Sequence, residues 1–258
     1  MLFIVRYSRP VVPLFILAFH HDLIFLHYQT LNAMGAEVID DPRLRGRRFV
    51  FEDRADAGRA LAAVLRERVD GDAVVLAIPS GGVPVAAAIA RELDWPMDLV
   101  IVRKLQIPSN PEAGFGAVTM SGEMFLNRRL VDELGLTDNE IEAARNKALA
   151  EGRSRQRALL DDRPRRPLER RTAVLVDDGL ASGYTMLAAL AQVRRENPTQ
   201  VIVAVPTGAD RTVLVVAEQA DLLICLNVRG GTFAVADAYR NWYDLTEEEA
   251  AATLRSVR

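Results

Sequence analysis

The chain has 258 residues, of which 50% are hydrophobic and 26% charged, so it is long enough for one large domain and typical of a globular protein. Its formal net charge of −3 creates no strong field toward nucleic acid or anionic lipid, and we expect neither as a partner. The one cysteine, Cys225, excludes a disulfide framework and a CxxC metal site, and its apolar neighbours predict a buried strand residue. All three histidines precede residue 28, which disfavours an enzyme built on a His-dependent triad or a His-bound zinc.

Residues 1–33 form an apolar, aromatic leader. Its uninterrupted apolar run, residues 11–19, is far shorter than the ~20 residues that a membrane-spanning helix needs. A signal peptide is an alternative because Arg6 and Arg9 precede the run, but no A-x-A cleavage site follows. We therefore expect an upstream start with Met34 as the natural first residue, a leader that packs poorly or is disordered, and a cytoplasmic protein.

From residue 49 onward, short apolar runs alternate with segments of helical period, and one domain is expected over residues 34–258. We predict strands at residues 73–79, 97–105, 172–178, 200–206 and 221–228, and helices at residues 53–68, 83–93, 137–160, 184–196 and 210–219. Repeated strand–helix units imply an α/β fold, in which a twisted parallel sheet is flanked by helices on both faces.

Local signals refine this order. Capping boxes at Thr137–Glu140 and Thr246–Glu249 predict two helix starts. Residues 106–119 are rich in Pro and Gly and lack helical period, so they predict a mobile loop or a hairpin. Because ligands bind an open parallel sheet at the carboxyl ends of its strands, we expect a site where the loops 79–83, 103–117 and 177–185 meet.

The stretch "VLVDDGLASGYTM" places Asp177 and Asp178 at the exit of a buried strand and follows them with small and hydroxyl-bearing residues. A small-residue loop that runs into a helix N-terminus directs backbone N–H groups at one point and holds a phosphate. Two carboxylates beside it suit vicinal hydroxyls or a hydrated Mg²⁺. The combination indicates a sugar-phosphate site; the alternative is that the acids only cap a turn.

This stretch resembles the signature that binds phosphoribosyl pyrophosphate (PRPP) in type I phosphoribosyltransferases, which have a Rossmann-like fold with a small C-terminal hood. The resemblance covers about residues 48–258 and implies that Asp177 and Asp178 bind the ribose 2- and 3-hydroxyls and take part in holding Mg²⁺. It assigns the 5-phosphate to the loop that follows, with Gly179, Ala181, Ser182, Gly183, Tyr184 and Thr185.

Two further segments resemble parts of that family. "IPSGGVPVA" resembles its pyrophosphate loop, where backbone amides, often with a strained peptide, contact the diphosphate. The resemblance gives this contact to Ser80, Gly81 and Gly82, although such a turn is usually only a turn. Arg103 and Lys104 begin a segment similar to the "RK…NPE…GAV" lid of a subgroup of uncharacterised members, which implies that they neutralise pyrophosphate. A solvated basic pair is the alternative.

"TFAVADAYRNWYDLTEEEA" resembles the hood of the same subgroup, which covers the acceptor, usually a nucleobase, and is expected at about residues 227–258. Phe233 and Trp242 could stack on a flat ring, whereas Tyr239 is expected to close the core of the small hood. The stretch departs from the family pattern at several positions, so the identity of the acceptor stays open.

The resemblance implies Mg²⁺-assisted transfer of the 5-phosphoribosyl group from PRPP to a nitrogen acceptor, a purine or pyrimidine base, with release of pyrophosphate, as in nucleotide salvage. No protein nucleophile is needed, but no general base is identifiable. A regulatory protein that binds PRPP or a nucleotide without turnover therefore remains open, and a homodimer is compatible with either. A dinucleotide-dependent oxidoreductase is disfavoured because the chain lacks GxGxxG.

Overall fold

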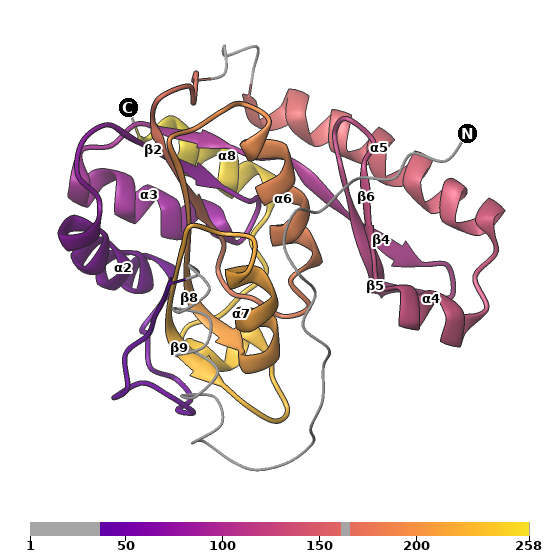
Figure 1. Ribbon diagram of the computed structural model, residues 1–258, viewed down its shortest axis with the longest axis horizontal. Coiled ribbons are helices and arrows are strands. Elements are labelled where there is room, and N and C mark those ends of the chain that lie inside the picture. Colours follow the sequence, from indigo (N-terminus) through magenta and orange to yellow (C-terminus); the bar gives the residue numbers. More distant parts are fainter. Residues whose placement is uncertain (1–36, 161–165, 258) are drawn as a thin grey trace.

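A parallel sheet forms the centre of the computed structural model, which describes residues 37–160 and 166–257 (Figure 1). Its strands run in the order β1-β9-β8-β7-β2-β3, and each neighbouring pair is parallel. They are β1 (Glu37–Ile39), β2 (Ala73–Ala77), β3 (Met97–Leu99), β7 (Thr172–Val176), β8 (Gln200–Ala209) and β9 (Leu222–Arg229). The expected α/β fold is confirmed, while the predictions for residues 1–33 and Met34 lie outside the described residues.

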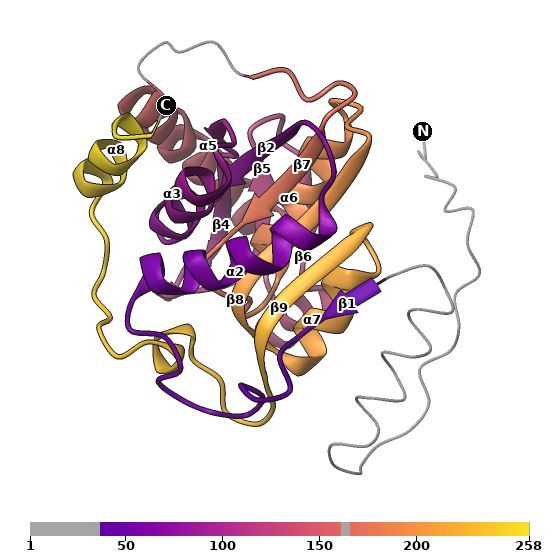
Figure 2. The same cartoon turned by 90° about the vertical axis from the view of Figure 1, so that its left-hand side faces the viewer.

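Helices cover both faces of this sheet (Figures 1 and 2). One face carries α2 (Arg54–Arg68), α3 (Gly82–Leu93) and α8 (Glu247–Arg255), and the other carries α6 (Tyr184–Arg194) and α7 (Asp210–Ala217). Both predicted capping boxes are confirmed, since Thr137 and Glu140 exchange hydrogen bonds, as do Thr246 and Glu249. Across the described ranges, no helix combines the length and the apolar character needed to cross a membrane.

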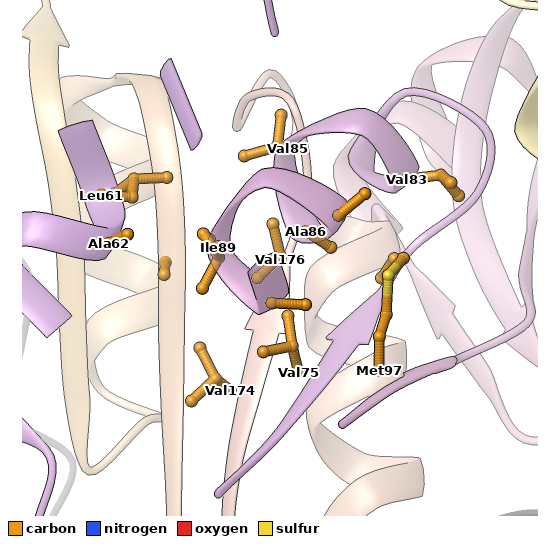
Figure 3. Packing of buried hydrophobic residues seen from close by; sticks show 14 of the residues in the cluster. Leu61, Ala62, Val75, Val83, Val85, Ala86, Ile89, Met97, Val174 and Val176 are labelled. Carbon is orange, nitrogen blue, oxygen red and sulfur yellow. The ribbon is translucent and has the colours of Figure 1, made fainter. Parts of the chain in front are cut away.

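The central strands divide the core into two layers. Successive residues of a strand point to opposite faces, so Val174 and Val176 pack toward α2 and α3, whereas Leu175 packs toward α6 and α7. In the first layer, Leu61 of α2 and Ile89 of α3 lie close to these valines (Figure 3). Burial on both faces explains why these strands are continuous apolar runs in the sequence.

A second, antiparallel sheet stands beside the first (Figure 1). It consists of β4 (Val102–Ile107), β5 (Asn110–Thr119) and β6 (Met124–Leu126), next to α4 (Arg128–Leu134) and α5 (Asp138–Leu160). Leu105, Phe115 and Val118 form a small core with residues of the two helices. The hairpin interpretation of residues 106–119 is thereby confirmed.

The prediction of one strand over residues 97–105 is wrong. The chain leaves the main sheet after Leu99 and enters the hairpin sheet at Val102. Val100 and Ile101 between them are buried, so the apolar run continues across a change of sheet that periodicity cannot reveal. The basic residues at 103 and 104 therefore belong to the hairpin sheet.

We expect Gly58→Val to lower the free energy of unfolding by about 1–3 kcal/mol, because overpacking at a close helix contact forces the backbone to move. A Cβ at Gly58 of α2 would lie 2.5 Å from the Val85 carbonyl oxygen of α3. Urea unfolding measures the change. Ala63→Val, at an exposed position of the same helix, is the control and should cost no more than about 0.7 kcal/mol of helix propensity. Equal losses in the two variants would contradict the close contact.

Candidate active site

A loop with two acids at its start connects β7 to α6. β7 ends at Val176, Asp177 and Asp178 follow, and α6 begins at Tyr184. Gly183 precedes the helix with a φ of 79°, a left-handed conformation that favours glycine. No side chain caps α6, so its first backbone N–H groups can point to an anion.

The neighbouring strand and helix fix this loop. The Leu180 N–H donates to the Thr207 carbonyl at 2.9 Å, and the Leu180 carbonyl accepts from the Ala209 N–H at 3.0 Å. Thr212 Oγ1 of α7 donates to the Ala181 carbonyl at 2.6 Å. The loop is therefore held by β8 and α7, while Ala181 itself stays exposed.

A cavity of about 230 Å³, here called the acid-loop cavity, lies against this loop. Its lining consists of Asp177, residues 179–183, Thr185 and Met186 on the loop side and Lys104, Gly114 and Gly116 on the hairpin side. The structure thus brings together Asp177, Lys104 and most of the predicted phosphate loop. Tyr184 begins α6 but does not line the cavity.

The two acids point to opposite faces of the sheet, as successive residues leaving a strand do. Asp177 lines the acid-loop cavity, on the side of α6. Asp178 faces α2, where its Oδ2 accepts a hydrogen bond from Arg54 Nε at 2.9 Å. The Asp178 carbonyl accepts another from the Tyr239 hydroxyl at 2.6 Å. The sequence-based interpretation made the acids equivalent, but only the first lines the cavity.

Burial raises the pKa of both carboxyl groups above the ordinary range, and that of Asp177 most strongly. The negative charge of Asp178 raises the pKa of Asp177 further. Arg54 opposes burial at Asp178 and lowers its pKa, because the guanidinium stabilises the ionised form. Carboxyl groups with such raised pKa values at the end of a strand are typical of functional sites.

The loop after β2 packs against the acid pair. Its Pro79–Ser80 peptide bond is cis. A Cβ on Gly81 would overlap with Oδ2 of Asp178, and one on Gly82 would lie 2.6 Å from the Val176 carbonyl oxygen. Both glycines are therefore needed for this approach. The loop that the sequence assigned to diphosphate lies beside the acids, although Ser80, Gly81 and Gly82 do not line the acid-loop cavity.

Arg103 and Lys104 are neighbours on β4 and also point apart. Lys104 lines the acid-loop cavity. Arg103 lies on the other side, where its Nη2 donates to Glu151 Oε2 of α5 at 2.6 Å. The predicted basic pair is therefore divided, and only Lys104 reaches the cavity.

Aromatic rings of the segment after β9 pack on arginine side chains. The Trp242 ring centroid lies 3.8 Å from the Arg54 guanidinium carbon, and that of Phe233 lies 5.2 Å from the Arg229 guanidinium carbon. Tyr239 is buried, as expected for a core residue, with its ring 5.3 Å from that of Trp242. Of the residues that the structure describes, neither Phe233 nor Trp242 lines the acid-loop cavity.

Sequence reasoning missed Arg54, the first residue of α2. Its side chain is only 7% exposed, although helical period alone gives an arginine no reason to be buried. The available signal was its position. A cation in the first turn opposes the helix macrodipole, so a specific anionic partner is expected.

A metal ion would have to rely on the acid pair. Within the described ranges, no group of three or more His, Cys, Asp or Glu side chains is arranged to hold a metal. Mg²⁺ commonly binds through one or two carboxylates together with phosphate oxygens and water. The donor set at Asp177 and Asp178 fits an ion that arrives with a phosphorylated ligand.

Comparison with known proteins agrees with the site. Residues 51–237 match the family model for the phosphoribosyl transferase domain, a span that contains the acid pair, Lys104 and both loops. The chain belongs to this family. The crystal structure of TT1426 from Thermus thermophilus shares the phosphoribosyltransferase-like fold with a TM-score of 0.66 and 35% identity, covering 80% of this chain and 98% of that one.

Two sequences from strains of Mycobacterium tuberculosis, each named "Putative phosphoribosyl transferase" (MT0597 and Rv0571c), are 40% identical to the chain over 205 residues. The match covers 80% of this chain and 46% of each relative. The chain therefore spans about half the length of these curated relatives.

We expect Asp177→Asn to stabilise the protein at about pH 7 by about 1 kcal/mol or more, since one unit of pKa elevation corresponds to about 1.4 kcal/mol. Burial raises the pKa of Asp177, so its stabilising contribution exists below the ordinary carboxyl pKa and is lost as pH rises through the elevated value. The amide avoids this loss, and its oxygen can keep the hydrogen bond from the Asp178 N–H. Urea unfolding should show the gain at about pH 7 and little at about pH 4. Destabilisation at neutral pH would refute it.

Proposed function

We propose that the protein is a Mg²⁺-assisted phosphoribosyltransferase, which transfers the 5-phosphoribosyl group of PRPP to a nitrogen acceptor and releases pyrophosphate. One observation carries the proposal: Asp177, the loop 179–183 and Lys104 line a single cavity. A carboxylate accepts hydrogen bonds from sugar hydroxyls, and a loop at a helix N-terminus binds phosphate. Membership of the phosphoribosyl transferase domain family supports the same ligand. As acceptor we propose a purine or pyrimidine base, in cytoplasmic nucleotide salvage.

The residues divide this task by position. Asp177 accepts hydrogen bonds from the ribose hydroxyls. The backbone N–H groups of the loop, with the hydroxyls of Ser182 and Thr185, hold the 5-phosphate. Lys104 and the backbone amides of residues 80–82 offset the charge of the diphosphate, which is the largest electrostatic contribution such a site can make.

Mg²⁺ would be held by the acid pair, chiefly Asp177, together with oxygens of the substrate. When bound, the ion neutralises negative charge on the leaving diphosphate. Asp178 contributes less to such a site, since its carboxylate is already paired with Arg54.

In the transfer, the bond between C1 of the ribose and the diphosphate oxygen breaks, and the oxygen keeps the electron pair. A nitrogen of the acceptor forms the new bond to C1 and gives up its proton to solvent. Positive charge develops on the ribose and negative charge on the diphosphate, so Lys104 stabilises the departing group. No side chain has to act as a nucleophile.

The second candidate is a regulatory protein that binds PRPP or a nucleotide without turnover. It is favoured by the packing of Phe233 and Trp242 on arginines rather than at the cavity. Incubation with PRPP, Mg²⁺ and a panel of purines and pyrimidines, followed by measurement of pyrophosphate, separates the two. Release that depends on one base supports the transferase. Calorimetric binding of PRPP without release supports the regulator, and no binding contradicts both.

We expect Lys104→Met to weaken PRPP binding or slow pyrophosphate release at least about tenfold, because a charge that faces the diphosphate is lost. Lys147→Met is the matched control: Lys147 lies on α5, is exposed and does not line the acid-loop cavity. It should bind and react like the wild type. Calorimetry and initial rates test both variants, and equal effects would remove Lys104 from the site.

A further inference from the structure

Arg54 connects parts of the site that are far apart in the sequence. Its Nε donates to Asp178 Oδ2 at 2.9 Å, and its Nη1 donates to the Tyr243 carbonyl at 3.0 Å. Its guanidinium carbon lies 3.8 Å from the centroid of the Trp242 ring. The segment after β9 passes beside the residues that precede α2, joined to them by backbone hydrogen bonds (Figure 2). One guanidinium thus links α2, the acid pair and residues 242–243.

Its position is unfavourable without these partners. A cation in the first turn of a helix opposes the macrodipole, and a side chain that is 7% exposed has lost most of its hydration. The ion pair with Asp178 and the stack on Trp242 offset these costs. Arg59 of the same helix differs, because it pairs with Asp56 in solvent at 53% exposure. The acid pair, rather than the helix, accounts for the placement of Arg54.

Few charged groups face the Asp178 carboxylate. From its own turn comes Asp177, whose Oδ1 accepts from the Asp178 N–H at 2.8 Å. From the segment after β9 comes the Tyr239 hydroxyl, which donates to the Asp178 carbonyl, and from the loop after β2 comes Gly81, which has no side chain. Burial raises the pKa of both acids, and Arg54 is the cation that lowers the pKa of Asp178.

Another cation approaches the loop after β2 from α5. Arg155 reaches the Pro79 carbonyl at 3.4 Å, but its guanidinium also pairs with Glu247 at 2.6 Å. Its charge is therefore largely offset before it reaches the acids. Arg54 remains the cation in direct contact with the pair.

We propose that Arg54 is a positioning residue that holds the acid pair in its ionised, sugar-binding form and ties it to the segment that carries Trp242. This inference rests on the proposed function. Without Arg54, two adjacent buried carboxylates have no cation in contact, and a proton binds to the pair. That proton is shared with Asp177, which then accepts fewer hydrogen bonds from ribose hydroxyls. Arg54 therefore sets the lowest pH at which the pair binds the sugar.

Calorimetric titration of PRPP with Mg²⁺ tests this in the full chain, from about pH 5.5 to about pH 9. Arg54→Met should bind about tenfold more weakly at pH 7, and the pH at which binding is half lost should rise by about one unit or more. Binding should recover at the alkaline end. Arg54→Lys keeps the charge but lacks the planar fork, so it should keep the wild-type midpoint with somewhat weaker binding.

Arg59→Met is the matched control on α2 and should retain both the affinity and the midpoint of the wild type. If Arg54→Met fails to fold, the same change is made in Asp178→Asn, where no carboxylate is left unpaired. The double variant should then have the pH profile of Asp178→Asn alone, and a further shift would overturn the role. A uniform loss across pH in Arg54→Met, with an unchanged midpoint, would also overturn it. Absence of binding by the wild type would instead contradict the proposed function.

Discussion

Two adjacent carboxylates at the end of a buried strand are the constraint around which this site is organised. Neither acid is fully hydrated, and each carries a negative charge beside the other. A glycine removes any side chain from the loop next to Asp178, a buried arginine supplies the opposite charge, and a tyrosine hydroxyl fixes the backbone. Three separate segments of the chain are thus brought to one point by the need to stabilise these two side chains.

The alternation of side chains along β7 gives the acids different surroundings. Asp177 follows the direction of Leu175 toward α6, where the phosphate-type loop and Lys104 complete a cavity. Asp178 follows Val176 toward α2, where Arg54 and the aromatic residues after β9 meet it. A single peptide unit therefore joins the cavity on one face of the sheet to the aromatic cluster on the other.

Much of this arrangement could be predicted, because buried parallel strands and glycine-containing loops leave strong local signals. The strands before and after Asp177, the capping boxes and the position of the acids at a strand exit all follow from local sequence. The change of sheet after Leu99 could not be predicted, since both sides of it are equally apolar. β1, with three residues, pairs with β9 across almost the whole chain, and so short a strand has no distinctive period.

Pairs of adjacent residues were the other limit. Nothing in the local pattern indicates that Asp178 turns from the cavity, or that Arg103 pairs with Glu151 while Lys104 lines the cavity. Such divisions depend on which neighbour each face of a strand meets, and those neighbours lie 48 residues away for Arg103 and 124 residues away for Asp178. Arg54 escaped notice for the same reason.

The stack of Trp242 on Arg54 gives the chain an intrinsic optical probe. Indole emission is sensitive to nearby charge, and this indole touches the cation that pairs with Asp178. The only other tryptophan of the chain, Trp95, packs at the edge of the main core beyond the end of α3. A change in fluorescence on ligand addition can therefore be assigned to one end of the sheet by replacing Trp95 with phenylalanine, without attaching a dye.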